Sequence, residues 1–523
     1  MRSRRLCLRA GPRTLPAVPV LALAAAALQL AACSSTPTAR QASDAPKAGA
    51  ALSAPATPTT PASAPLIAQQ FDSAHGAQGA TLSGSDATSA SAALLMAWDR
   101  FFTEPRLQAL IRLALEHNRD LRAAALNVEQ ARAQAVIREA DLWPSVNLGV
   151  GGVRVPTNTG GVSTTVTGGL AVTAYEIDLF GRVRQQASAA QAQLQASEFL
   201  QAAARASLIA AVASAYANLQ ADEALMSVTQ DTLGGREENL RIVQGRMRSG
   251  AASALELVQA ESLLQAARAA LAQVQRQRAL DESALVLLVG RPLPTDLPAP
   301  LAMPLPARGA TAAAIGPTAA IGPTGGINAG VLSAGLPSEV LAQRPDIAAA
   351  EAQLRAAQAN VEAARRALFP RISLTASYGQ ASKELSSLFA GGNWVWGVAP
   401  QLLAPIFDAG RLRAGVQQAQ AQRQAALAQY EKSVQVAFKE VNDALAARTT
   451  LSDQGQALQA QVRAEAQRVE LAQLRWRLGA SAYLEVLDAQ RSLYAAQTAL
   501  IQAQAGIAQN QASLYKVLGG GAR

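Results

Sequence analysis

Side chains that usually carry enzyme chemistry are scarce in this sequence. Its 523 residues include two histidines and two cysteines. His75 lies in a Ser/Thr/Ala/Pro-rich segment, and His117 lies in a helical stretch, where an exposed helix residue is a simpler interpretation than a general base. The sequence has no nucleophile elbow, no phosphate-binding glycine loop and no Cys/His spacing typical of a metal site. We therefore expect no catalytic residue, no metal site and no cofactor.

Cys33 is the residue for which the sequence does predict a covalent modification. Five arginines precede an apolar run from Leu15 to Leu30, which ends in "LAAC". A charged segment, an apolar segment and a small-residue cleavage point are typical of a signal peptide. The small residues before Cys33 are also typical of a bacterial lipobox, so we expect residues 1–32 to be removed and Cys33 to be acylated, for example with palmitate. An ordinary signal peptide with an incidental cysteine is the alternative.

Charge and composition exclude a nucleic-acid partner and favour long helices. The net charge of +9 falls to +4 once the five arginines of the signal peptide are removed. The remaining basic residues alternate with acids along helical stretches, which is typical of a solvated face. Half of the residues are hydrophobic, yet only 4% are aromatic. An apolar share made mostly of alanine favours long, closely packed helices.

The chain contains two copies of one unit. Asp120 aligns with Asp346 and Pro144 with Pro370 at an offset of 226 residues, and "RMRSGAASALELVQA" aligns with "RWRLGASAYLEVLDA" at an offset of 229. We expect a signal peptide at 1–32, a tether at 33–96, a first repeat at 97–300, a low-complexity linker at 301–335, a second repeat at 336–519 and a tail at 520–523. Such self-similarity marks a duplicated unit.

The pattern of each copy predicts a helix, two strands, a long helix and a further helix, in this order. One helical stretch from Trp98 is expected to stop at Pro144. Alternating residues after Pro144 and Pro370 predict half-apolar strands, with returning strands near 165–177 and 393–407. Trp394 and Trp396 share one face, as interfacial aromatics of a membrane barrel do, although packing would also explain them.

The helices that follow are unusually long. Residues 182–248 form one stretch of 67 residues, which would span on the order of 100 Å. Gly234 and Gly235 weaken or kink this helix without ending it.

No stretch beyond the signal reaches about 18 apolar residues, so we expect any membrane span to be made of strands. Four strands cannot close a barrel, and open edges are not tolerated in lipid. The chain must therefore share its hairpins with other copies. Gly181 and Gly410 are the expected strand-to-helix turns. The arginines that follow them would reach lipid phosphates, or would simply form a solvated first helical turn.

Five ordered motifs between Trp98 and Gly519 resemble the TolC-like outer-membrane efflux family, in its NodT-type lipoprotein branch. They are "WDRFFTEPRLQALIRLALEHNRDL", "YEIDLFGRVR", "LPSEVLAQRPDIAAAEAQL", "FKEVNDALAA" and "YLEVLDAQRSLYAAQ". The resemblance implies an α+β membrane protein: a homotrimer whose four strands per protomer make one 12-stranded β-barrel, continuous with a long periplasmic α-helical barrel. It also implies a lipid-anchored outer-membrane location, and export of drugs, dyes or metal ions through a periplasmic adaptor (membrane fusion protein) and an inner-membrane RND transporter.

The same resemblance assigns roles to four residues. Gly250 and Gly479 would lie at the periplasmic hairpin tips that contact the adaptor; helix-capping glycines without a partner are the alternative. Glu485 and Asp488 match the acidic positions that ring the closed periplasmic aperture, where three copies would gather six carboxylates and favour cations. Glu485 replaces the more usual Asp, and the first copy offers Glu256 and Gln259, so a solvated acidic face remains the alternative.

Three other functions compete with efflux. A periplasmic adaptor would have one helical hairpin and soluble β-domains, whereas this chain has two hairpins and amphipathic strand pairs. A coiled-coil scaffold would leave the strands unused. Within the channel class, the outer-membrane component of a type I protein secretion system is the alternative to drug efflux.

Overall fold

The computed structural model describes residues 97–158, 160–299, 344–388 and 392–520. These residues belong to one compact unit. The expected signal peptide, the tether with Cys33, the linker at 301–335 and nearly all of the short tail lie outside the described residues. In chain order the elements are α3 (Trp98–Phe101), α4 (Pro105–His117), α5 (Arg119–Ala140), β1 (Val146–Pro156), β2 (Val162–Glu176), α6 (Arg182–Arg248), α7 (Ala254–Val289), α9 (Pro345–Arg366), β3 (Arg371–Ser382), the 3₁₀ turn η1 (Leu385–Ser387), β4 (Trp394–Leu403), α10 (Arg411–Arg477) and α11 (Tyr483–Val517).

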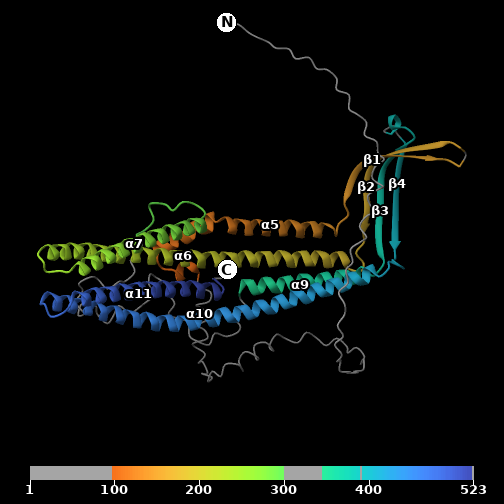
Figure 1. Cartoon of the computed structure of the whole chain (residues 1–523). Helices are drawn as coiled ribbons and strands as arrows, with labels where there is room; N and C mark the ends of the chain where they lie inside the picture. Colours follow the sequence, from red (N-terminus) through yellow and green to blue (C-terminus); the bar gives the residue numbers. More distant parts are fainter. Residues whose placement is uncertain (1–96, 159, 300–343, 389–391, 521–523) are drawn as a thin grey trace, which may run out of the picture. The chain divides into compact units, whose positions relative to one another are not determined.

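Two helices of equal length organise the helical part. α6 and α10 each contain 67 residues and begin directly beyond the sheet (Figure 1). α5 and α9 pack along their sheet-proximal halves, while α7 and α11 return along their distal halves. The predicted helix at 182–248 is confirmed, and it continues through Gly234 and Gly235. Alanine on the contacting faces lets these helices lie close together along their length.

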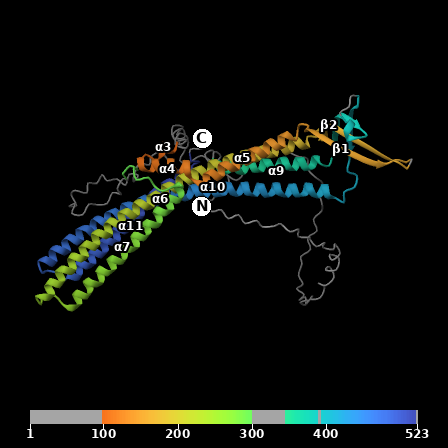
Figure 2. The ribbon, with the colours of Figure 1, turned by 90° about the horizontal axis from the view of Figure 1, so that it is seen from above.

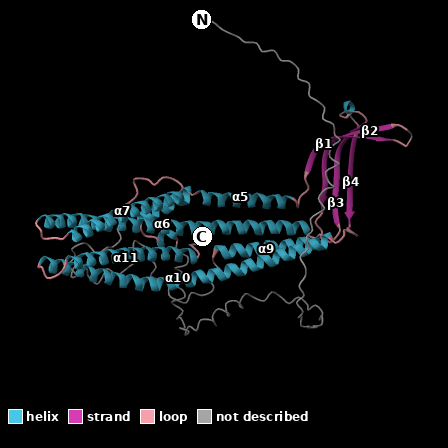
Figure 3. Cartoon of the chain, viewed as in Figure 1, coloured by secondary structure: helices cyan, strands magenta, loops and turns pink. Residues whose placement is uncertain are grey.

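The four strands form one antiparallel sheet in the order β1-β2-β3-β4 (Figure 3). Both hairpins are paired as the sequence predicts, and β2 pairs with β3 to join them. A bulge between Val172 and Tyr175 interrupts the register of β2 against β3, and Ala174 has a φ of +52° there. β4 ends at Leu403, short of the predicted residue 407, because Pro405 has no N–H to donate to a ladder.

The predicted single helix before Pro144 is wrong, because the chain breaks at Asn118. The Asn118 side chain accepts a hydrogen bond from the Leu121 N–H at 2.8 Å and donates one to the Leu288 carbonyl at 2.8 Å. It therefore caps α5 and ties it to the end of α7. The preceding helices α3 and α4 pack on α6, α7 and α11 through a core of bulky residues, in which Phe102, Ile111 and Leu285 are fully buried.

By mean hydropathy alone, one described helix, α6, could cross a membrane, although it has no unbroken run of 18 apolar residues. An 18-residue window of α6 has a mean hydropathy of 1.3, and 39% of that window is buried within the chain. The cause is alanine, which is apolar by hydropathy but small enough to pack between helices. α6 lies against α5, α7, α9 and α11, which is the environment of a packed core helix.

Candidate functional site

The sheet has one face rich in large apolar residues and one face made mostly of small residues. Across the strands, Leu148, Leu170, Tyr378 and Trp396 lie in one row of the register. These side chains are largely exposed, Leu148 to 79% and Trp396 to 76%. The adjacent row contains Gly149, Gly169 and Gly379, and it ends on β4 with Val395. A face of exposed aliphatic and aromatic residues is what lipid contact requires, and a face of small residues leaves room for an aqueous interior.

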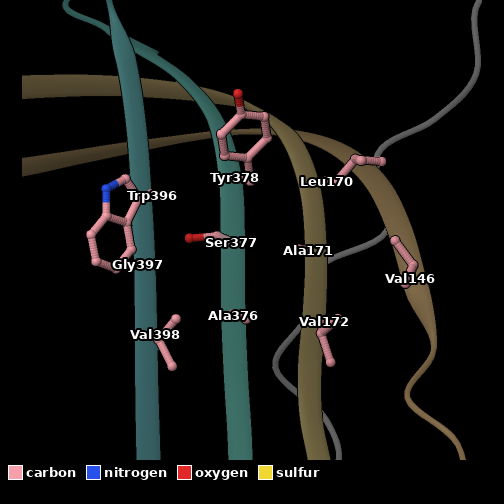
Figure 4. A pocket seen from close by; sticks show the side chains of 10 residues that line it. All are labelled: Val146, Leu170, Ala171, Val172, Ala376, Ser377, Tyr378, Trp396, Gly397 and Val398. Atoms are coloured by element: carbon pink, nitrogen blue, oxygen red, sulfur yellow. The ribbon is translucent and has the colours of Figure 1, made fainter.

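The apolar face holds a shallow hollow of about 400 Å³. Figure 4 shows Trp396 of β4 and Tyr378 of β3 on neighbouring strands. Leu170 and Val172 of β2 and Val146 of β1 line the hollow on its opposite edge. The Tyr378 ring also packs against Trp394, with centroids 5.2 Å apart. Side chains from all four strands therefore contribute to one continuous apolar surface.

Gly181 and Gly410 lie between the sheet and the two long helices. Their φ angles are +78° and +85°, a left-handed conformation that side-chain-bearing residues rarely adopt. Beside Gly410, the Asp408 carboxylate accepts hydrogen bonds from the backbone N–H groups of Gly410 and Leu412, at 3.0 and 2.8 Å. The Asp178 carboxylate accepts one from the Arg184 N–H at 2.9 Å. An aspartate thus caps each long helix where it leaves the sheet.

The arginines after these glycines differ between the two copies. Arg182 makes a bidentate pair with Glu176, at 2.9 and 2.5 Å, and Arg184 pairs with Asp178. These two guanidinium groups therefore bind protein carboxylates rather than being left for lipid phosphates. Arg411 acts electrostatically on Asp408, but within the described residues neither Arg411 nor Arg413 forms a salt bridge.

The distal ends of the helical hairpins share one capping geometry. Gly250 and Gly479 have φ angles of +75° and +72°. The N–H of Ala251 donates to the Arg246 carbonyl and that of Ala480 to the Arg475 carbonyl, both at 2.8 Å. Each glycine N–H donates to the carbonyl three residues before it, at 3.0 Å. This is the Schellman arrangement, in which a left-handed glycine ends a helix.

The two hairpins also pack against each other near these ends. Val243 and Ala260 of the first hairpin lie in one buried cluster with Tyr483 and Leu487 of the second. The Arg246 guanidinium lies 5.5 Å from the centre of the Trp476 ring. A cation over an aromatic face adds an attraction to this apolar contact.

Glu485 and Asp488 lie on the first turns of α11, and both are paired with arginines. Asp488 accepts hydrogen bonds from Arg468 of α10 at 2.6 Å and from Arg491 at 2.8 Å. Glu485 lies 3.4 Å from Arg475 of α10. The hydrogen bond from Arg468 holds the pKa of Asp488 below its ordinary value. The acidic pair is therefore part of a charge network of both signs.

Sequence reasoning missed the arginine partners. Arg491 could have been found, because it follows Asp488 by three residues and so lies on the same helix face. Arg468 and Arg475 lie on a different helix, and only the hairpin brings them to the acids. In the first copy, one oxygen of Glu256 is buried without a hydrogen-bond donor among the described residues, so its surroundings differ from those of Glu485.

Comparisons with known proteins agree with this architecture. The family model described as outer membrane efflux protein matches residues 110–291 and 336–520. The toluene efflux pump outer membrane protein TtgC of Pseudomonas putida is 40% identical over 437 residues, covering 82% of this chain and 86% of TtgC. The outer membrane protein OprJ of Pseudomonas aeruginosa is 37% identical over 431 residues, covering 81% of this chain and 86% of OprJ.

Solved structures give the same result for the fold. The open state of the MtrE outer membrane channel of Neisseria gonorrhoeae matches with a TM-score of 0.72 at 40% identity, over 82% of this chain and 92% of that one. CusC matches with a TM-score of 0.71 at 34% identity, over 81% of this chain and 94% of that one. The chain therefore belongs to the outer membrane efflux protein family and is an outer-membrane efflux channel with a helical periplasmic part.

Proposed function

We propose that three copies of this chain form one pore, with a 12-stranded barrel in the outer membrane and a helical barrel in the periplasm. The supporting observation is the sheet: β1 and β4 are its edges, and each pairs with one strand among the described residues. Unpaired backbone groups cannot face lipid, and four strands are too few to close on themselves. Pairing β4 of one copy with β1 of the next satisfies both edges.

We also infer that the chain arose by tandem duplication. The family model matches twice, at 110–291 and 336–520. α6 and α10 have equal lengths of 67 residues, and α5 and α9 have equal lengths of 22 residues. Two similar units per chain would give a three-copy assembly six similar units around its axis.

The proposed cargo is small, toxic organic solutes. Relatives are named as efflux pump proteins for toluene, for solvents and for antibiotics. The face of the sheet assigned to the interior consists mostly of small residues such as Gly149, Gly169 and Ser377, and its larger residues, among them Val395 and Arg371, form no continuous patch of one chemistry. Passive conduction fits such a wall, with selection made by an inner-membrane RND pump. A periplasmic adaptor would contact the tips at Gly250 and Gly479.

The charge network at the tips is the proposed aperture. Glu485 and Asp488 would line it, and their pairing with Arg468, Arg475 and Arg491 would reduce the cation preference that six bare carboxylates would give. Reversal potentials in planar bilayers test this. An Arg468→Ala, Arg475→Ala variant is expected to shift selectivity towards cations, and a Glu485→Ala, Asp488→Ala variant towards anions. Equal reversal potentials in both variants and the wild type would contradict the assignment.

Acylation of Cys33 would anchor each copy to the membrane by a second means. Metabolic labelling with radioactive palmitate is expected to label the wild type and not a Cys33→Ser variant. Labelling of the variant would show that the lipid is attached elsewhere, and an unlabelled wild type would exclude the lipid anchor.

The experiment for the function itself combines conductance with drug sensitivity. The purified protein is expected to form water-filled pores in planar bilayers. Deleting its gene is expected to increase sensitivity to toluene and to antibiotics, with recovery on re-expression. The type I secretion alternative predicts the loss of a secreted protein with unchanged drug sensitivity.

A further inference from the structure

Two acidic residues, of which Asp222 is buried and Asp281 is half-buried, lie between α6 and α7, away from the tips. Asp222 of α6 is only 5% exposed, and its Oδ2 atom is buried without a hydrogen-bond donor among the described residues. The carboxyl group of Asp281, from α7, lies within hydrogen-bonding reach of Asp222. The two helices run side by side here (Figures 1 and 2). Two carboxyl groups in contact, with one oxygen lacking a donor, can form a hydrogen bond only if one of them is protonated.

One cation, Arg278 of α7, acts on Asp222 and opposes the rise of its pKa, but it is not reserved for this pair. Arg278 of α7 is already shared between Glu223, at 3.7 Å, and Glu282, at 3.3 Å. Gln277 donates to the Oδ2 atom of Asp281 at 3.3 Å. The ionisable groups acting on Asp222 are thus Glu223 on its own helix and Asp281 and Arg278 on α7.

The third helix at this level, α11, contributes apolar side chains and one buried amide, that of Gln504, which is 2% exposed. Ile501 and Ala505 of α11 pack on Ala221 and Ala224, close neighbours of Asp222 on α6. None of these α11 side chains carries a charge that would balance a carboxylate. A buried carboxylate in such a place is costly unless it is protonated or paired.

Burial and the contact with Asp281 together raise the pKa of Asp222 to about 7. A carboxyl group can donate to a neighbouring carboxylate, whereas two carboxylates repel each other. Because its pKa is raised, the Asp222 carboxyl group of the folded chain stays protonated between pH 4 and pH 7, where an aspartate of the unfolded chain has already lost its proton. The stabilising hydrogen bond is therefore present below about pH 7 and is lost as the pH rises through that value.

We propose that Asp222 and Asp281 form a proton-binding site that holds α6 and α7 together, and that loss of the shared proton separates the two helices. The tip glycine Gly250 lies 28 residues beyond Asp222, roughly 40 Å along the helix, so a tilt of a few degrees there would move the tip by roughly 2 Å. The pH of the medium outside the cell would thereby alter the position of the first hairpin tip. This inference does not depend on which solutes the channel carries.

Infrared spectroscopy of the full-length protein in detergent tests the shared proton directly. A protonated carboxyl group has a carbonyl stretch separate from the amide bands. The wild type is expected to lose such a band between pH 6 and pH 8, and Asp222→Asn is expected to lack it. The control Glu261→Gln, which changes an exposed acid on α7, should behave like the wild type. A wild type without a band that titrates in this range, or an Asp222→Asn variant that keeps it, would overturn the proposal.

Spin labels test the helix separation. Cysteines replacing the exposed residues Gln230 on α6 and Gln273 on α7 would report the distance between the helices near the pair. The distance is expected to increase from pH 6 to pH 8 in the otherwise wild-type chain. Asp222→Asn keeps a donor towards Asp281 at all pH values, so its distance should stay at the pH 6 value, and Asp281→Asn should behave similarly. An equal increase in the Asn variants and in the wild type would overturn the proposed switch.

Discussion

Replacing Gly169 by alanine should prevent the sheet from assembling. Gly169 of β2 lies opposite Gly379 of β3. A Cβ atom at Gly169 would lie 2.4 Å from the Tyr378 carbonyl oxygen and 2.5 Å from the Gly379 Cα atom. Both neighbours are backbone atoms of a paired strand, so no side chain can rotate away. Relieving the clash requires moving β3 by roughly 0.7 Å, a sizeable fraction of the roughly 4.8 Å spacing between strands.

Such a displacement would stretch the nearby ladder hydrogen bonds beyond useful length. A backbone hydrogen bond lost in the membrane is not replaced by water, so the expected cost is about 2–5 kcal/mol. Gly149 of β1 is the matched control, because it lies in the same row of the sheet and a Cβ atom at this position would have no neighbour within 4 Å among the described residues. Gly149→Ala should therefore be tolerated.

The assay measures the amount of folded protein in the outer-membrane fraction, from its heat-modifiable migration in gels. The melting temperature of the purified folded protein is measured as well. We expect little folded Gly169→Ala and near-normal Gly149→Ala. If the two variants accumulate and melt alike, the close approach of β2 and β3 does not constrain this sheet.

Three further predictions concern the helices. Arg344 is buried and bound to Asp346 at 2.7 Å, Glu440 at 2.6 Å and the Val517 carbonyl at 3.3 Å. Arg344→Ala should therefore lower the free energy of unfolding in urea by about 2–4 kcal/mol, and the exposed control Arg355→Ala by less than about 0.5 kcal/mol. Equal losses in the two variants would contradict this. Gly479→Val forces a branched residue to a φ of +72°, so trypsin should cleave faster after Arg477, and an unchanged rate would argue against a strained tip. The lowered pKa of Asp488 keeps its pair with Arg468 intact from pH 8 to pH 5, so spin labels on α10 and α11 should separate only below about pH 4, and separation near neutral pH would contradict the pairing.

The sequence predicted best what depends on local pattern. Alternating residues and the glycine before each charged stretch located the strands and the long helices, because strand faces and left-handed turns have strong local signatures. The break at Asn118 was missed because the residues on both sides favour helix. Its cause is a tertiary contact, the hydrogen bond to the Leu288 carbonyl 170 residues away.

The site was only partly predictable for the same reason. Glu485 and Asp488 could be selected from a motif, but their charge is set by Arg468 and Arg475, which approach only when α10 and α11 fold back on each other. Asp222 gave no signal at all in an alanine-rich helix. Its burial and its contact with Asp281 exist only once α6 and α7 pack.

Joining of the sheet edges between copies is the central requirement of a shared barrel. Disulfide cross-linking tests it most directly, with one cysteine placed in β1 and one in β4, scanned in pairs along residues 148–152 and 396–400 in a Cys33→Ser background. We predict that oxidation gives covalent species of two and three chains for pairs at matching heights in the sheet, and none for a control pair in which both cysteines lie on β1. Cross-links confined to single chains, or none at any pair, would contradict a barrel shared between copies.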